Sequence, residues 1–205
     1  PDPKFTVIDN NKVLESLHIL NQKNIKISDC IHNKFFLFLK KIDNLLDLLD
    51  YLVVSTGPGS YTSLRVGISF MLGISYSKKL PIYGVTALEL LSKFVMLDEF
   101  YKTIIIICSS SNQNFICLPQ ENKIFQYNVI KIDSDYSLKN INFKLYTKCI
   151  SNFKLPNFIS KKITPFTKET KYLNLEKTFN ENFFTNNFNS TVLNPVYISE
   201  NKLFD

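Results

Sequence analysis

The sequence has little of what many catalytic and metal sites are built from: it contains 2 histidines, 4 cysteines and 5 glycines in 205 residues. The cysteines form no CxxC pair, so their spacing fits no zinc site. A chain of this length does not need disulfides to fold. We therefore expect free thiols in a reducing, cytoplasmic compartment at Cys30, Cys108, Cys117 and Cys149.

Long apolar runs are also missing. The longest run, Ile104 to Cys108, has the length of a strand, whereas a membrane span needs roughly 18–20 consecutive apolar residues. Pro1-Asp2-Pro3-Lys4 is not followed by the apolar region of a signal peptide. With 45% hydrophobic and 20% charged residues, the composition is typical of a soluble globular protein and predicts no membrane partner.

The two histidines lie far apart, His18 on an expected strand and His32 near an expected helix start. They cannot form the i, i+4 pair of a metal-binding helix. Ser60 follows a sharp turn but lacks the GxSxG pattern of a catalytic serine. We therefore expect no catalytic residue and no metal ligand. A metallopeptidase relative stays the least favoured alternative, which metal analysis would test.

The net charge of +6 leaves a nucleic-acid surface open as an alternative, because phosphates favour clustered Lys and Arg. Arg65 is the only basic residue between Tyr51 and Tyr76. The lysines of the second half stand among many Asn, Ile and Phe residues. That mixture is typical of an AT-rich genome, in which lysine is a default surface residue, and charge alone is a weak signal.

Hydrophobic periodicity predicts an α/β protein with a mixed sheet. A hairpin is expected at 4–8 and 12–19, around the turn-forming Asp9-Asn10-Asn11. We place a domain boundary near Phe100, giving an N-terminal lobe over 1–100 and a smaller C-terminal lobe over 101–205. Helices are also predicted at 33–49, from the turn at 55–62 to about 77, and at 86–100. Thr86 and Glu89 form a capping box at the start of the last of these helices. The remaining predicted strands are at 52–54, 80–85, 103–108 and 114–118.

All five glycines lie between Gly57 and Gly84, which predicts tight backbone geometry in that segment alone. The turn Gly57-Pro58-Gly59-Ser60 opens a helix and has two explanations. It could cradle a phosphate, but it lacks the lysine of the Walker pattern, and Thr62 stands where the dinucleotide fingerprint needs a third glycine. The favoured explanation is structural: Gly59 lets the chain turn, and Ser60 or Thr62 caps the helix.

The helix that follows is apolar on two sides. Leu64, Ile68, Met71 and Ser75 form one stripe, and a second stripe lies roughly opposite. Such a helix must be buried all round, either by the second lobe or by a partner, and we favour a partner. Gly67 and Gly73 cost this helix about 1 kcal/mol each, which suggests close helix–helix approach. The second stripe is Val66, Phe70, Gly73 and Ser77, and the preceding helix adds Phe36, Leu37 and Leu48 outside its own core stripe.

Three segments carry a family resemblance. The run Gly57-Pro58-Gly59-Ser60-Tyr61-Thr62-Ser63-Leu64-Arg65-Val66-Gly67 resembles GPGSFTGLRIG, the signature of the TsaB (YeaZ) family. Residues 80–88 and 194–198 resemble two further segments of that family. The match is specific over about 50–90 and thin over 110–190. Tyr61 and Ser63 depart from the signature, and Ser109-Ser110-Ser111 replaces the family's Asp-Ala-Arg.

The resemblance implies an actin/Hsp70-like (ASKHA, RNase H-like) fold of two lobes with mixed sheets, whose first strand would precede Pro1. It implies a non-catalytic subunit that binds a TsaD-like catalytic subunit, joined by a TsaE-like ATPase, for threonylcarbamoyl transfer to the adenosine beside the tRNA anticodon. Homodimerisation is possible, and no cofactor is expected in the isolated chain, although a nucleotide could bind at the interface. The alternative is a small ASKHA-type ATPase or kinase with a degenerate phosphate loop. The expected partner-binding residues are Phe36, Leu37, Tyr61, Arg65, Val66, Ser69, Phe70 and Gly73.

Overall fold

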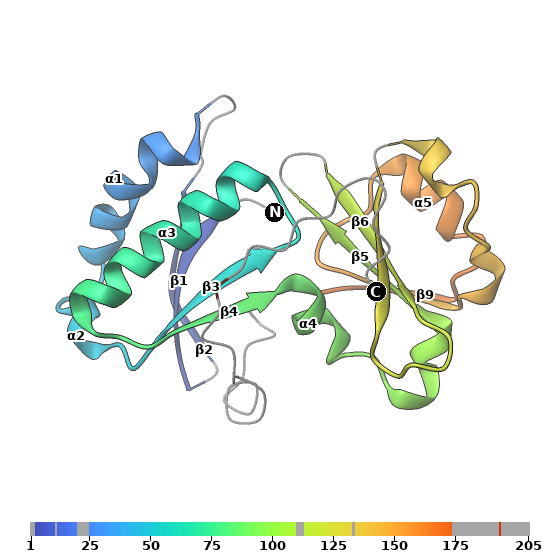
Figure 1. Ribbon diagram of the computed structural model, residues 1–205, viewed down its shortest axis with the longest axis horizontal. Helices are drawn as coiled ribbons and strands as arrows, with labels where there is room; N and C mark the ends of the chain where they lie inside the picture. Colours follow the sequence, from blue (N-terminus) through green and yellow to red (C-terminus); the bar gives the residue numbers. More distant parts are fainter. Residues whose placement is uncertain are drawn as a thin grey trace. The chain divides into compact units, whose positions relative to one another are not determined.

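The computed structural model (Figure 1) describes residues 3–10, 12–19, 25–109, 113–132, 134–173 and 193. The chain divides between Thr86 and Ala87 into two compact units. We call residues 3–86 together with Leu193 the N-terminal unit, and residues 87–173 the C-terminal unit. The division precedes the expected boundary near Phe100, because the helix that begins at Ala87 packs on the sheet of the C-terminal unit.

The N-terminal unit contains two separate two-stranded sheets and three helices. The predicted hairpin is present, with β1 antiparallel to β2, whereas β3 and β4 are parallel. Figure 1 shows α1 and α3 side by side over the strands. The elements are β1 (Lys4–Asp9), β2 (Lys12–His18), α1 (Ile27–Leu39), α2 (Leu45–Leu48), β3 (Leu52–Gly57), α3 (Tyr61–Lys78) and β4 (Ile82–Thr86).

The helix predicted over 33–49 differs from the structure. It begins earlier, at Ile27, and ends at Leu39, and a turn separates it from the short α2. Asn44 has a left-handed backbone with φ of 53°, a conformation that asparagine tolerates better than most residues. The polar sequence from Lys40 to Asn44 therefore forms a turn that the apolar stripe alone did not reveal.

The C-terminal unit is built on one five-stranded mixed sheet of order β7-β6-β5-β8-β9. The central β5 is antiparallel to β6 and parallel to β8. The predicted α/β class with mixed sheets is thus confirmed. The elements are α4 (Ala87–Ser92), the 3-10 helix η1 (Leu97–Lys102), β5 (Thr103–Cys108), β6 (Asn114–Pro119), β7 (Tyr127–Ile132), η2 (Asp135–Leu138), η3 (Phe143–Leu145), β8 (Lys148–Ser151), α5 (Asn157–Ile163) and β9 (Glu169–Tyr172).

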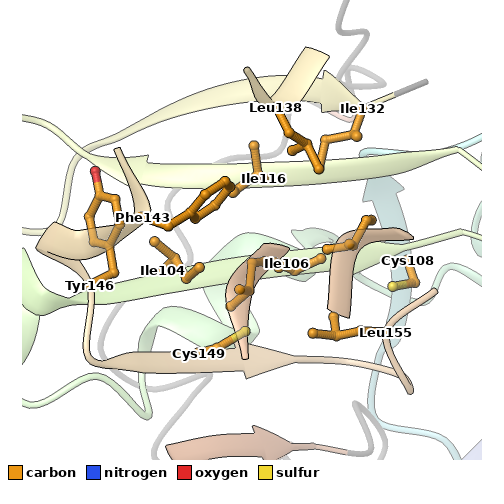
Figure 2. Packing of buried hydrophobic residues seen from close by; sticks show 12 residues of the cluster. Ile104, Ile106, Cys108, Ile116, Ile132, Leu138, Phe143, Tyr146, Cys149 and Leu155 are labelled. Carbon is orange, nitrogen blue, oxygen red and sulfur yellow. The ribbon is translucent and has the colours of Figure 1, made fainter. Parts of the chain in front are cut away.

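Side-chain alternation along β5 divides the core of this unit into two layers. Ile104 and Ile106 face one cluster, which α5, η2 and η3 cover (Figure 2). Ile105 and Ile107 face the other cluster, which α4 and η1 cover. Both faces of the central strand are therefore buried, which is why Thr103–Cys108 reads as a continuous apolar run rather than an alternating one.

One predicted helix is divided in the structure, and other predicted segments lie outside the described residues. The helix predicted over 86–100 is split into α4 and η1. The segment 179–189 and the run 194–198 lie outside the described residues. Within the described part of the chain, no helix is both long enough and apolar enough to cross a membrane.

All four cysteines are free thiols, and three of them are buried. Burial raises the pKa of the Cys108 and Cys117 thiols and raises that of Cys149 to about 12. Since the thiolate is the reactive form, we expect a thiol reagent at pH 8 to modify only Cys30 rapidly and all four cysteines in denaturant. Counting labelled thiols by mass spectrometry tests this; rapid labelling of Cys149 in the native protein would contradict the packing of β8.

Candidate partner-binding surface

An open groove runs between α1 and α3 in the N-terminal unit and has a volume of about 330 Å³. α3 supplies most of its lining, α1 supplies His32, and α2 supplies Leu46. The groove is mostly apolar, with an ion pair at one end, where Lys78 Nζ lies 2.8 Å from Asp47 Oδ1. The lining residues are His32, Leu46, Ser69, Phe70, Gly73, Ile74, Ser77 and Lys78.

The floor of the groove is held by a cluster of aromatic rings. The Phe70 ring lies edge-on to His32 and to Phe35 of α1, with centroid distances of 5.0 and 5.1 Å. It also lies 6.0 Å from the ring of Phe5 on β1. Val66 packs against the same core. The second face of α3 is therefore partly covered at Val66 and Phe70 by α1 and β1, whereas Gly73 and Ser77 of the same stripe line the groove.

The open side of α3 lies in a third direction. Tyr61, Arg65, Ser69, Leu72 and Tyr76 follow one another at spacings of three and four residues, and all are exposed. Residues at this spacing share one face of a helix. Tyr76 is 89% exposed and Leu72 is 41% exposed. The sequence reasoning missed both residues, although the i, i+3 and i, i+4 pattern from Tyr61 contains the signal.

Two of the exposed polar positions on this face have defined surroundings. The Arg65 guanidinium lies 3.9 Å from the centroid of the Tyr61 ring, at cation–π distance. Ser69 lines the groove. The pairing of Arg65 with Tyr61 keeps a flat aromatic ring and a cation together beside the start of α3.

The expected residues of α1 are also exposed. Phe36 is 59% exposed, and Leu37 is more than half exposed. Phe36 lies one helical turn after His32, so it borders the groove from the α1 side. Lys40 Nζ lies 4.4 Å from the centroid of its ring. We use "helix surface" for the exposed apolar side chains of Phe36, Leu37, Leu48, Tyr61, Leu72 and Tyr76.

An ion pair fixes the chain after α1. Lys41 Nζ donates to Glu15 Oε1 on β2 at 2.6 Å. This hydrogen bond, with that from the Ser16 backbone N–H, holds the pKa of Glu15 below its ordinary value of 4.5. Because the folded-state pKa is lowered, the contribution to stability is present above pH 4.5 and is lost as the pH falls through the folded pKa.

The turn before α3 serves local geometry. Gly57 has φ of 116°, a conformation that favours glycine, and it precedes a cis peptide bond to Pro58. The positive φ of this turn is therefore at Gly57, whereas the prediction gave Gly59 the role of letting the chain turn. Ser60 is the N-cap residue, but its side chain makes no capping bond, contrary to the prediction. Its hydroxyl instead accepts a hydrogen bond from Ser63 Oγ at 3.2 Å.

The glycine of β4 is explained by a close approach. A Cβ at Gly84 would lie 2.7 Å from Thr56 Cγ2 and 2.9 Å from Leu193 Cδ2. Contacts this short are not tolerated by real Cβ atoms. Glycine at position 84 therefore allows β3 and β4 to pair with the side chain of Thr56 buried between them.

The two glycines of α3, Gly67 and Gly73, lie where a side chain would meet open space. A Cβ at Gly67 or at Gly73 would meet no atom within 4 Å. No neighbouring helix of the described chain therefore requires either glycine. The predicted close helix–helix approach stays a prediction for a partner helix. Gly73 lines the groove, whereas Gly67 does not.

We expect Gly73→Ala to raise the free energy of unfolding by about 1 kcal/mol, because alanine favours a helix more than glycine does. The added methyl group narrows the groove, so we also expect weaker binding of any partner seated there. Urea denaturation and titration with the partner measure the two effects. Gly67→Ala is the matched control, with the same gain in stability and unchanged binding; undiminished binding by Gly73→Ala would contradict the use of the groove.

The two histidines lie apart from each other and in different surroundings. His18 ends β2, and His32 packs on Phe70 in α1. Among the residues that the structure describes, no three His, Cys, Asp or Glu side chains come together as metal ligands.

The fold is that of a two-unit α/β protein with mixed sheets, and it is similar to the structure of YeaZ from Pseudomonas aeruginosa. The TM-score is 0.51 at 11% identity, covering 85% of this chain and 82% of that one. The chain belongs to the TsaD family, described as tRNA N6-adenosine threonylcarbamoyltransferase, whose profile matches residues 36–183.

The curated relatives include both transferases and a TsaB protein. A tRNA N6-adenosine threonylcarbamoyltransferase of Fusobacterium nucleatum is 32% identical over 79 residues, which is 38% of this chain and 23% of that protein. The TsaB protein of Buchnera aphidicola, named for tRNA threonylcarbamoyladenosine biosynthesis, is 38% identical over 45 residues, 22% of this chain and 21% of that protein. The predicted TsaB resemblance is thus confirmed, although the matched segments span only about a quarter or less of these relatives.

Proposed function

We propose that this protein is a non-catalytic subunit that binds a TsaD-like catalytic subunit through its helix surface, for threonylcarbamoyl transfer to tRNA adenosine. The observation that carries the proposal is the open apolar groove between α1 and α3, together with the exposed Phe36, Leu72 and Tyr76 on the same two helices. Contiguous exposed apolar side chains around a groove are typical of protein-binding surfaces. The membership of a tRNA-modifying family supports the class of partner.

A partner helix fits this groove by its shape and chemistry. Apolar side chains at helical spacing would enter between α1 and α3, as in other helix-in-groove interfaces. Tyr61 with Arg65 and the solvent-exposed Tyr76 would contact the partner at the two ends of α3. Tyrosine and arginine are enriched among the residues that contribute most to protein–protein affinity. A TsaE-like ATPase, tRNA reached through the complex and a nucleotide at the joint interface remain parts of this proposal.

The expected actin-like fold also remains a prediction. Among the described strands of the N-terminal unit, β1 pairs only with β2 and β3 only with β4.

A second candidate function has support from the comparisons: the chain could itself be a transferase. The family profile and the relative from Caldicellulosiruptor saccharolyticus, 30% identical over 83 residues, both carry the transferase description. That relative is matched over only 25% of its length. We favour the subunit because the chain's exposed apolar surface needs a partner.

The test is an assay for threonylcarbamoyladenosine in tRNA, with the purified chain alone, with the TsaD-like subunit of the same genome, and with both. We expect product only when the two proteins are combined, and we expect them to elute together from a gel-filtration column. Product formed by this chain alone would establish the transferase. Calorimetry with ATP and magnesium on the isolated chain tests the ATPase alternative, which micromolar binding would favour.

A further inference from the structure

The positive charge of the protein is concentrated in one segment. Residues 138–172 contain eight lysines and a single carboxylate, Glu169. This excess is larger than the chain's net charge of +6, so the rest of the sequence is close to neutral. A genome-wide preference for lysine would spread lysines without regard to acids. The segregation therefore calls for a cause specific to this part of the protein.

The segment folds into the layer over one face of the C-terminal sheet. Leu138, Phe143, Ile159 and Ile163 point into the core cluster shown in part in Figure 2, and α5 is the main helix of the layer in Figure 1. Most lysines of the segment are exposed, whereas Lys148 at the sheet edge is half-buried. We call this layer, with its exposed Lys144, Lys154, Lys161, Lys162 and Lys168, the lysine layer.

The lysines of this layer lack the partners that lysines have elsewhere. Lys148, at the sheet edge, is paired with Glu99 and with Glu169. By contrast, within the described part of the chain no carboxylate lies within ion-pair distance of the five lysines that define the layer. The layer on the opposite face, formed by α4 and η1, mixes Lys93 and Lys102 with three acids. These five lysines therefore differ from Lys148, and their positive charge is not neutralised by a carboxylate of the described residues.

Exposed aromatic rings lie among these lysines. Phe153 precedes Lys154 and is 54% exposed, and Phe166 lies two residues before Lys168. The backbone beneath Phe153 is fixed, because Ser151 Oγ donates to the Phe153 carbonyl at 2.8 Å. Asn152 next to it accepts from the Cys108 N–H at 2.8 Å and donates to the Cys108 carbonyl at 3.0 Å. Phe153 is thus held outward on a fixed turn rather than exposed by a loose loop.

We propose that the lysine layer binds RNA directly, with its lysines on phosphates and Phe153 stacked on an unpaired base. Lysines supply the sequence-independent attraction to phosphate, and aromatic side chains stack on bases that are splayed out of single strands and loops. An acidic protein would use the lysines but would leave the outward aromatic rings unexplained. The inference goes beyond the proposed function, in which RNA is reached through the catalytic subunit.

Fluorescence anisotropy of the full chain with a labelled RNA stem-loop tests the proposal. With about four lysines on phosphates, log Kd is expected to rise with log salt at a slope of about 3, which is a loss of roughly 50-fold between 50 and 200 mM salt. Lys161→Gln combined with Lys162→Gln is expected to lower that slope by about 1.4. Phe153→Ala is expected to weaken binding about tenfold and to leave the slope unchanged.

The controls separate this proposal from the helix surface. Lys93→Gln with Lys102→Gln removes the same charge from the opposite layer and is expected to leave RNA binding unchanged. The Lys161/Lys162 variant is expected to bind the TsaD-like subunit normally, so failure of either proposal is visible without the other. Equal weakening by both lysine pairs, or unchanged binding by the Lys161/Lys162 variant, would overturn the site. Unchanged RNA binding by Phe153→Ala would reduce it to a general polyanion surface and overturn the assignment to RNA.

Discussion

Leu72→Asp is expected to weaken binding of the TsaD-like subunit by at least about 100-fold, because a charge at the centre of a desolvated contact costs several kcal/mol. Leu72 is 41% exposed and stands beside Gly73, which lines the groove. The free energy of unfolding is expected to change by no more than about 0.5 kcal/mol, since exposed substitutions outside special features seldom cost more. Calorimetric titration and urea denaturation measure the two quantities.

Leu145→Asp is the matched control for this variant. Leu145 is 60% exposed and belongs to η3 in the C-terminal unit, so it is not one of the residues that define the helix surface. It is expected to bind the partner as tightly as the unaltered protein. If Leu72→Asp also retains full affinity, α3 does not contact the partner at this position.

Phe70→Ala is expected to lower the free energy of unfolding by about 2–4 kcal/mol, within the range found for aromatic truncation in cores. The Phe70 ring contacts the rings of Phe35, His32 and Phe5, so its removal leaves a cavity where α1, α3 and β1 meet. Chemical denaturation followed by circular dichroism measures the loss.

Phe36→Ala removes the same ring from the exposed side of α1 and is expected to cost less than about 0.5 kcal/mol. Equal losses from the two substitutions would show that Phe70 does not hold α1 to α3. A charged residue at Phe70 or Val66 would disrupt the core of the N-terminal unit. Such a variant cannot distinguish a loss of partner binding from a loss of folding.

The sequence was sufficient to predict a helix or strand whose start and end are marked by residues within the element itself. The turn at Gly57 and the polar end at Lys78 enclose an uninterrupted apolar helix, and α3 runs between them as predicted. The five residues Ile104–Cys108 are buried on both faces of β5, so their apolar run identified the strand directly. The α/β class follows from the order of these elements.

Other features depend on which elements meet in space, and periodicity does not contain that information. Val66 and Phe70 lie on a stripe of α3 that looks exposed when this helix is considered alone. In the structure, α1 and Phe5 pack on these two residues. The start of α1 at Ile27 depends on burial of Ile27 and Ile31 in that same core. Leu72 and Tyr76 continue the helical pattern from Tyr61, but only the packing of α1 and β1 on α3 identifies this stripe as the exposed one.

The same limit applies to charge. The lysines of the second half could be counted in the sequence, but their lack of carboxylate partners could not. The sequence alone does not distinguish Lys148 from Lys161. In the structure, Lys148 pairs with Glu99 and Glu169 at the sheet edge, whereas Lys161 is exposed on α5. Pairing across strands distinguishes a structural lysine from one available to a ligand.

Site-specific photo-crosslinking tests the helix surface most directly. A photoreactive phenylalanine analogue replaces Tyr76, the most exposed side chain of that surface at 89%, and the variant is irradiated with the TsaD-like subunit and tRNA. The account predicts a covalent product with the subunit from position 76 and none from position 145. A crosslink from position 145 without one from position 76 would contradict it.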